Sequence, residues 1–220
     1  MRESYAEQLD LISDALVQMT RLVGSAMNRA TQSLLDADLH LAEAVIASDA
    51  NIDAIAADIE ERCFDLTALQ QPVATDLRII VGALRIAASL ERMGDLAEHV
   101  AKQARLRYPR PAVPQELRGT FAEMGGLAEA IVSKTGAVIA TRDVDLAADV
   151  ARHDEAVDRL HRELFRIVLS PSWTHGVEAA IDVTLLSRYY ERYADHAVSV
   201  ARRVVTIVTG EPYVEVSFDS

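Results

Sequence analysis

The sequence predicts an all-α protein built from two tandem, similar halves. Aromatic residues make up only 5% of the 220 residues, and strict apolar–polar alternation is confined to the last few positions. This composition and periodicity favour helices over sheet, so no internal strand is expected. Residues 91–97 read Glu-Arg-Met-Gly-Asp-Leu-Ala and residues 191–197 read Glu-Arg-Tyr-Ala-Asp-His-Ala. Two modules of about a hundred residues each fit this repeat.

The first module is expected to start with two long helices. Apolar residues recur at three- and four-residue spacing from Asp10 to Leu35, which predicts the first helix there. Residues 36–38 then offer an acidic cap for a second helix from about Leu39 to Ala68. That helix should end before Pro72, because the residue preceding a proline is disfavoured in the helical region.

The third helix is predicted to begin near Thr75 and Asp76, whose side chains suit the free amide groups of a first turn. It should reach Arg107. Three prolines fall in the seven residues that follow, and this segment is the clearest linker in the chain. We therefore expect a first three-helix module over residues 1–108 and a linker over residues 109–114.

The second module, residues 115–210, is expected to repeat this plan. Its predicted helices span residues 115–141, 145–168 and 175–209. A Ser-Pro-Ser sequence at 170–172 separates the last two, and Gly210 and Pro212 should end the last one. The tail, residues 211–220, alternates apolar and polar residues but is too short to form a sheet alone, so it is either frayed or docked on a partner.

The net charge and the cysteine content limit which classes of partner and which cellular compartment fit the chain. A net charge of −12 argues against a nucleic-acid partner, which needs clustered Lys and Arg, and suits cations instead. Cys63 is the only cysteine, so it cannot form an intramolecular disulfide and should be a small buried apolar residue. The acidic amino end does not resemble a signal peptide, and no apolar stretch is long enough to span a membrane, so a cytoplasmic location is expected.

Each module carries two acidic pairs with four-residue spacing, so each pair projects from one face of its helix. At about 1.5 Å of rise per residue, Asp53 lies ~27 Å before the helix hairpin near residue 71 and Glu91 lies ~30 Å after it. The same count in the second module gives ~26 and ~30 Å, so the pairs should lie level twice. Carboxylate oxygens gathered in this way can hold metal ions. The candidate metal ligands are Asp49, Asp53, Glu91, Asp95, Asp154, Asp158, Glu191 and Asp195.

Residues next to these acids are weaker candidates. Arg92 and Arg192 point about 100° away from the preceding glutamate, so we expect them to pack or pair elsewhere. His99 shares the face of Glu91 and could donate a ligand nitrogen or cap the cluster by hydrogen bonding. Its counterpart Ser199 is a poorer ligand, and His196 is expected at the surface or just outside the cluster.

These motifs together resemble the PhoU family of phosphate-signalling regulators, and its actinobacterial members most closely. The resemblance covers nearly the whole chain and is carried by Gln-Pro-Val-Ala-Thr-Asp-Leu-Arg at 71–78, the two Glu-Arg-x-Gly/Ala-Asp phrases and the Asp-x-x-x-Asp pairs before them. It implies two three-helix bundles related by pseudo-twofold symmetry. It also implies that the acidic surface of each bundle can bind multinuclear iron, zinc or similar clusters, and that the protein regulates rather than catalyses.

The family's acidic motifs fall on the eight acids named above, while His99, Ser199 and Ala194 depart from its usual pattern. The resemblance leaves the metal open among iron, zinc, manganese and magnesium. It implies that the protein restrains the phosphate-starvation response by linking the ATPase of a phosphate ABC transporter to a sensor histidine kinase. Membrane association would then be peripheral, through these partners, and a homodimer is possible.

Two other functions stay open at this point. A metal-free helical adaptor would bind its partners through helix faces while the acids remain solvated. A carboxylate-bridged dimetal oxidase would also use a helical bundle, but it needs Glu-x-x-His ligand pairs, which the sequence lacks. No recognisable nucleophile–base arrangement or phosphate-binding loop is present, so we expect no enzyme activity.

Overall fold

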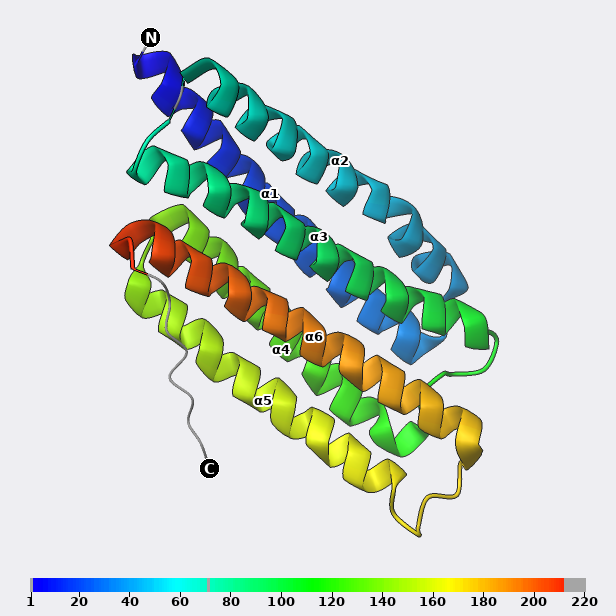
Figure 1. The fold of residues 1–220 in the computed structure, drawn as a ribbon. Helices are drawn as coiled ribbons and strands as arrows, with labels where there is room; N and C mark the ends of the chain where they lie inside the picture. The colour runs from blue at the N-terminus through cyan, green and yellow to red at the C-terminus, as the bar shows by residue number, and fades with distance from the viewer. Residues whose placement is uncertain (1, 71, 212–220) are drawn as a thin grey trace.

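The computed structural model describes residues 2–70 and 72–211, and every regular element within them is a helix (Figure 1). The elements are α1 (Arg2–Asp36), α2 (Leu39–Gln70), α3 (Thr75–Arg107), the short 3₁₀ helix η1 (Gln115–Leu117), α4 (Arg118–Thr141), α5 (Val144–Val168) and α6 (Gly176–Thr209). The all-α prediction is confirmed. None of the described helices is long and apolar enough to cross a membrane.

The predicted helix bounds hold to within a few residues, with one larger difference. The first helix begins at Arg2 and not at Asp10. Tyr5 and Leu9 are partly buried against the core, so tertiary packing extends the helix beyond its most periodic stretch. The predicted tail falls on residues 212–220, which lie outside the described residues, apart from Glu211.

Helix ends confirm one predicted cap and correct another. The Asp38 carboxylate accepts a hydrogen bond from the backbone N–H of Leu41 at 3.0 Å, as a cap of α2 should. Thr75 and Asp76 lie in the first turn of α3, as predicted, but their expected hydrogen bonds to its free amide groups are not formed. Ala74 occupies the N-cap position with a φ of 50°, and among the described residues no side chain caps the helix there.

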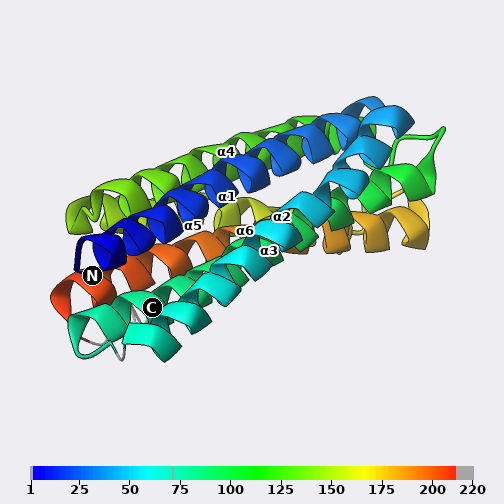
Figure 2. The same ribbon diagram turned by 90° about the horizontal axis from the view of Figure 1, so that it is seen from above.

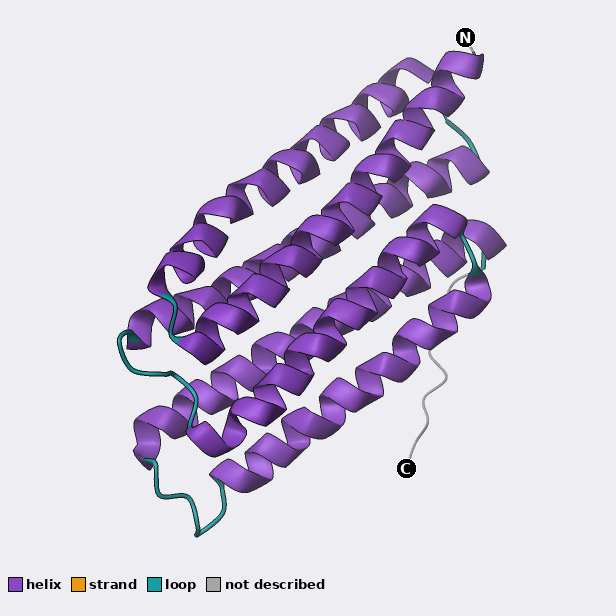
Figure 3. Cartoon of the chain, turned by 180° about the vertical axis from the view of Figure 1, so that it is seen from behind, coloured by secondary structure: helices purple, strands orange, loops and turns teal. Residues whose placement is uncertain are grey.

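The six long helices form two three-helix modules that pack side by side (Figures 1 and 2). Across the boundary α1 packs on α4, and α3 packs on α6. The outer helices, α2 and α5, each pack only on helices of their own module, as the rear view in Figure 3 also shows. The acidic pairs of α3 and α6 therefore lie on the two helices that meet along one seam, which we call the α3–α6 seam.

One continuous hydrophobic core runs through both modules. Cys63 is fully buried in it, and this burial raises the pKa of its thiol to about 11, which confirms a packing role.

The last helix ends at Gly210, as predicted. Gly210 adopts a φ of 77° just after α6, the left-handed conformation in which helices commonly stop.

Candidate metal-binding faces

The first acidic face consists of Asp49 and Asp53 on α2 and Glu91 and Asp95 on α3. Gly94 makes the two helices meet closely here: a Cβ added to it would stand 2.8 Å from Oδ1 of Asp49. Burial, followed by the charges of Asp53, Glu98 and Asp95, raises the pKa of Asp49 to about 6.

Glu91 joins the same face. Its pKa is raised first by burial and then by the negative charges of Asp53 and Asp95. Asp53 acts on Glu91 across the helix pair, so these two acids lie near each other, as their predicted level placement requires.

The second acidic face repeats this arrangement on α5 and α6 and is more closed. Burial, followed by the charges of Asp158, Asp195 and Glu191, raises the pKa of Asp154 to about 7. The pKa values of Glu191 and Asp195 are also raised, with burial as the largest cause. Oδ1 of Asp154 and Oε2 of Glu191 are buried, and neither has a hydrogen-bond partner within the described part of the chain. Buried carboxylate oxygens of this kind favour either a proton or a bound cation.

Arginines on the same helices compete for these carboxylates. A nitrogen of the Arg92 guanidinium lies 2.6 Å from Oδ2 of Asp95, so the expectation that Arg92 acts elsewhere was wrong. The prediction considered its immediate neighbour, whereas residues three apart share a helix face. Arg188 pairs with Glu191 in the same way and was not predicted, although its position three residues before Glu191 was the signal.

With these ion pairs in place, the carboxylates are not arranged around one point. Within residues 2–70 and 72–211, no three His, Cys, Asp or Glu side chains are placed so that they could hold one metal ion together. Metal binding at either face would therefore require the carboxylate side chains to rearrange. The eight acids stay predicted ligands, and the unpartnered oxygens of the second acidic face fit a cation.

The two histidines lie along the α3–α6 seam. Nδ1 of His99 donates a hydrogen bond to the backbone carbonyl of Asp95 at 2.5 Å. Its ring is tilted by 48° to that of Tyr189 of α6, with centroids 5.3 Å apart. His196 is half-buried, and its pKa is lowered first by burial and then by Arg192, with a smaller effect from Arg92 of α3. Both acidic faces therefore border one seam.

Stability should depend on pH through the second acidic face. Because the pKa of Asp154 rises from 3.8 to about 7 on folding, the folded state binds more protons between these values and loses stability as the pH rises through them. We expect Asp154→Asn to stabilise the metal-free chain at pH 8 by on the order of 1–2 kcal/mol, after allowance for solvent screening.

Urea unfolding in the presence of a chelator, repeated from pH 5 to pH 8, measures this effect. The variant's advantage should shrink as the pH falls toward 5, where the native carboxyl is protonated. An advantage independent of pH would show that the amide stabilises the site for another reason.

Comparisons with known proteins match this architecture. A model of the PhoU domain matches residues 16–104 and again 121–204, one match for each module. A Mycobacterium tuberculosis protein, "Phosphate-specific transport system accessory protein PhoU homolog 2", is 52% identical over 96% of this chain and 99% of its own length. The corresponding homolog of Aquifex aeolicus is 35% identical over 84% of each chain.

Solved structures agree with the fold. The crystal structure of PhoU from Pseudomonas aeruginosa superimposes with a TM-score of 0.82 at 30% identity and covers 94% of this chain and all of that one. A Streptococcus pneumoniae structure, 23% identical, has a TM-score of 0.87 over 96% of this chain and supports the fold alone. With both modules matched and relatives aligned over nearly their full length, the chain belongs to the PhoU domain family.

Proposed function

We propose that this chain is an accessory regulator of phosphate-specific transport. The observation that carries the proposal is the match, at 52% identity over nearly the whole length, to a protein named as an accessory protein of that system. In the finer form of the proposal, it restrains the phosphate-starvation response from the cytoplasm by linking a transporter ATPase to a sensor histidine kinase. No step of this role needs catalysis by the chain itself.

The acidic faces would determine how the regulator binds its partners. When bound, iron, zinc, manganese or magnesium would supply positive charge to these clusters. On the second acidic face Asp154, Asp158, Glu191 and Asp195 would hold the ion. Support comes from the raised pKa of Asp154 and from the two unpartnered carboxylate oxygens, because a cation would remove both costs.

A metal-free adaptor is the second candidate, and a specific observation favours it. Arg92 pairs with Asp95, and Arg188 pairs with Glu191, so internal cations already neutralise part of each face. In that form the acids contribute a partner-facing surface whose charge is tuned by these arginines.

Elemental analysis of protein purified without chelator or affinity tag tests the metal proposal. We expect the native chain to carry stoichiometric metal and a variant with Glu91, Asp95, Glu191 and Asp195 changed to alanine to lose it. A matched control changes the same number of exposed acids away from both faces, Glu7, Asp14, Glu123 and Glu163, and should keep the metal.

A phosphate-regulon reporter in cells carrying each variant tests the regulatory role separately. Loss of metal together with loss of repression supports metallated faces as part of signalling. Normal repression by the metal-free variant would show that the acidic faces are not needed, and a native chain without metal would favour the adaptor. Repression that persists in cells lacking the protein would contradict the regulatory proposal itself.

A further inference from the structure

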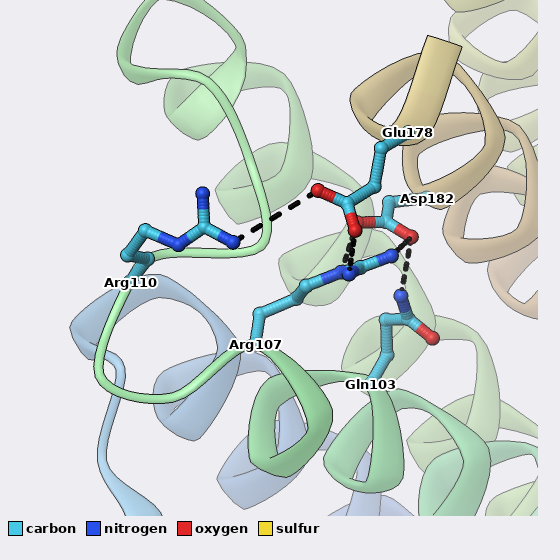
Figure 4. A network of polar contacts seen from close by, with 5 residues as sticks. All are labelled: Gln103, Arg107, Arg110, Glu178 and Asp182. Atoms are coloured by element: carbon cyan, nitrogen blue, oxygen red, sulfur yellow. Dashed lines mark hydrogen bonds and ion pairs between the residues drawn. The ribbon is translucent and has the colours of Figure 1, made fainter.

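The α3–α6 seam has two ends, which the pseudo-twofold symmetry relates through residues one hundred positions apart. At one end, buried Asp182, only 3% exposed, accepts hydrogen bonds from Gln103 at 2.6 Å and from Arg107 at 2.6 and 2.8 Å (Figure 4). Arg107 also pairs with Glu178, and Arg110 lies 3.9 Å from the same carboxylate. The cations at this end are thus matched by carboxylates of the chain.

The chain that leaves α3 covers this end. Residues 110–115 line a hollow of about 400 Å³ together with Glu178 and Asp182 at the start of α6. Ala112 and Val113 of this segment are buried. The seam is therefore closed here by the segment that follows one of its own helices.

At the opposite end of the α3–α6 seam the two helices meet in the same way, but the side chains carry different charges. The positions that correspond to Glu178, Asp182, Gln103 and Arg107 are Arg78, Gly82, Arg203 and Ile207. The correspondence holds in space: a Cβ on Gly82 would stand 2.8 Å from Cγ1 of Ile207, and one on Gly210 would stand 3.1 Å from a guanidinium nitrogen of Arg78. The two carboxylates of the first end are thus replaced by an arginine and a glycine.

A pocket of about 790 Å³ opens where the carboxylates are missing. It is lined by Arg78, Arg85, Arg202 and Arg203, and by the exposed aliphatic side chains of Leu77 and Val81. Among the described residues, no carboxylate lies within ion-pair distance of Arg78, Arg85 or Arg203. The pKa of Arg203 is lowered by burial and by the like charge of Arg85. In a chain of net charge −12, this cationic and apolar pocket fits an acidic segment that also carries apolar side chains.

We propose that the pocket is the docking site of this chain's own segment 212–220. The segment leaves α6 through Gly210, beside Arg78 at the rim of the pocket, as residues 110–115 leave α3 beside Glu178. Its sequence, Pro-Tyr-Val-Glu-Val-Ser-Phe-Asp-Ser, carries two acids, Glu215 and Asp219, among aromatic and aliphatic residues. Extended at about 3.3 Å per residue, it is long enough to cross the pocket. Docking supplies the carboxylates that this end of the seam lacks, and an acidic partner segment would have to displace it.

Disulfide trapping in the full chain tests the docking. Cysteines replace Ser217 in the segment and Ser199 in the pocket lining; the native Cys63, buried and with a raised thiol pKa, does not interfere. Under mild oxidation we expect rapid trapping at low salt. Glu215→Lys with Asp219→Lys should slow it by about tenfold or more, because each lost charged contact weakens the docked state, while the tether stays the same length.

Reversing the pocket charges gives the matched test. Arg85→Glu with Arg203→Glu should slow trapping similarly, and combining both pairs of changes should restore it, because the charges are then exchanged between segment and pocket. Circular dichroism checks that each variant is folded. If the pocket variants do not fold, the trapping rates of the segment variants by themselves decide the test. If none of these charge changes altered the rate of disulfide trapping, the proposal would be overturned. If inorganic phosphate then bound the native chain in calorimetry, but not the Arg85→Glu/Arg203→Glu variant, the pocket would be a small-anion site instead.

Discussion

Replacing Asp182 with alanine is expected to lower the free energy of unfolding by about 3–5 kcal/mol, the range for removing one partner of a buried ion pair. The change leaves the Arg107 side chain, 20% exposed, without its buried acceptor, and Gln103 loses its partner as well. Glu178→Ala is the matched control on the same helix. Its side chain is 60% exposed, so its loss should cost less than about 1 kcal/mol.

Denaturant unfolding of both variants measures the difference, and a third variant tests its cause. Arg107→Ile combined with Asp182→Gly copies the contact that the chain already uses at the other end of the seam, between Gly82 and Ile207. Because no charge is left buried, this double variant should be more stable than Asp182→Ala alone. Equal stability of the two variants would show that lost packing, and not an unpaired charge, dominates.

The sequence was sufficient for those features that depend on local signals. Proline positions and helical periodicity placed the helix bounds because both act within a few residues of the chain. The level placement of Asp53 and Glu91 was also predictable, because a hairpin of two straight helices fixes heights by residue count. The cap of α3 failed because Ala74 adopts a positive φ that no residue pattern announced.

Contacts between the modules could not be predicted. Arg107 and Asp182 are 75 residues apart, and nothing in either helix signals that α3 and α6 meet. The arginine pocket has the same origin, since Arg78 and Arg85 of α3 and Arg203 of α6 gather only when the modules pack. The sequence repeat also gives a wrong expectation here. It suggests that the two ends of the α3–α6 seam are equivalent, whereas their charged side chains differ.

Replacing Tyr190 with alanine should have a similarly large effect, a loss of about 3–5 kcal/mol for a large aromatic residue removed from a core. Tyr190 is fully buried on α6, and its ring lies 6.0 Å from that of Phe121 on α4. Its hydroxyl lies 2.7 Å from Oγ1 of Thr31 on α1, in the other module. Since Thr31 donates its own proton to the Met27 carbonyl, Tyr190 must be the donor of the bond between modules.

Removing only the hydroxyl separates packing from hydrogen bonding. Tyr190→Phe should cost about 1 kcal/mol, whereas Tyr193→Phe on the same helix should be neutral or stabilising, because the buried Tyr193 hydroxyl has no partner among the described residues. Calorimetry of Tyr190→Ala adds a test of cooperativity. If the shared core makes the modules unfold together, the variant should show a single transition at lower temperature. Two separate transitions, with only the second module's lowered, would mean that the modules are stable independently and that the α3–α6 seam can open without unfolding either one.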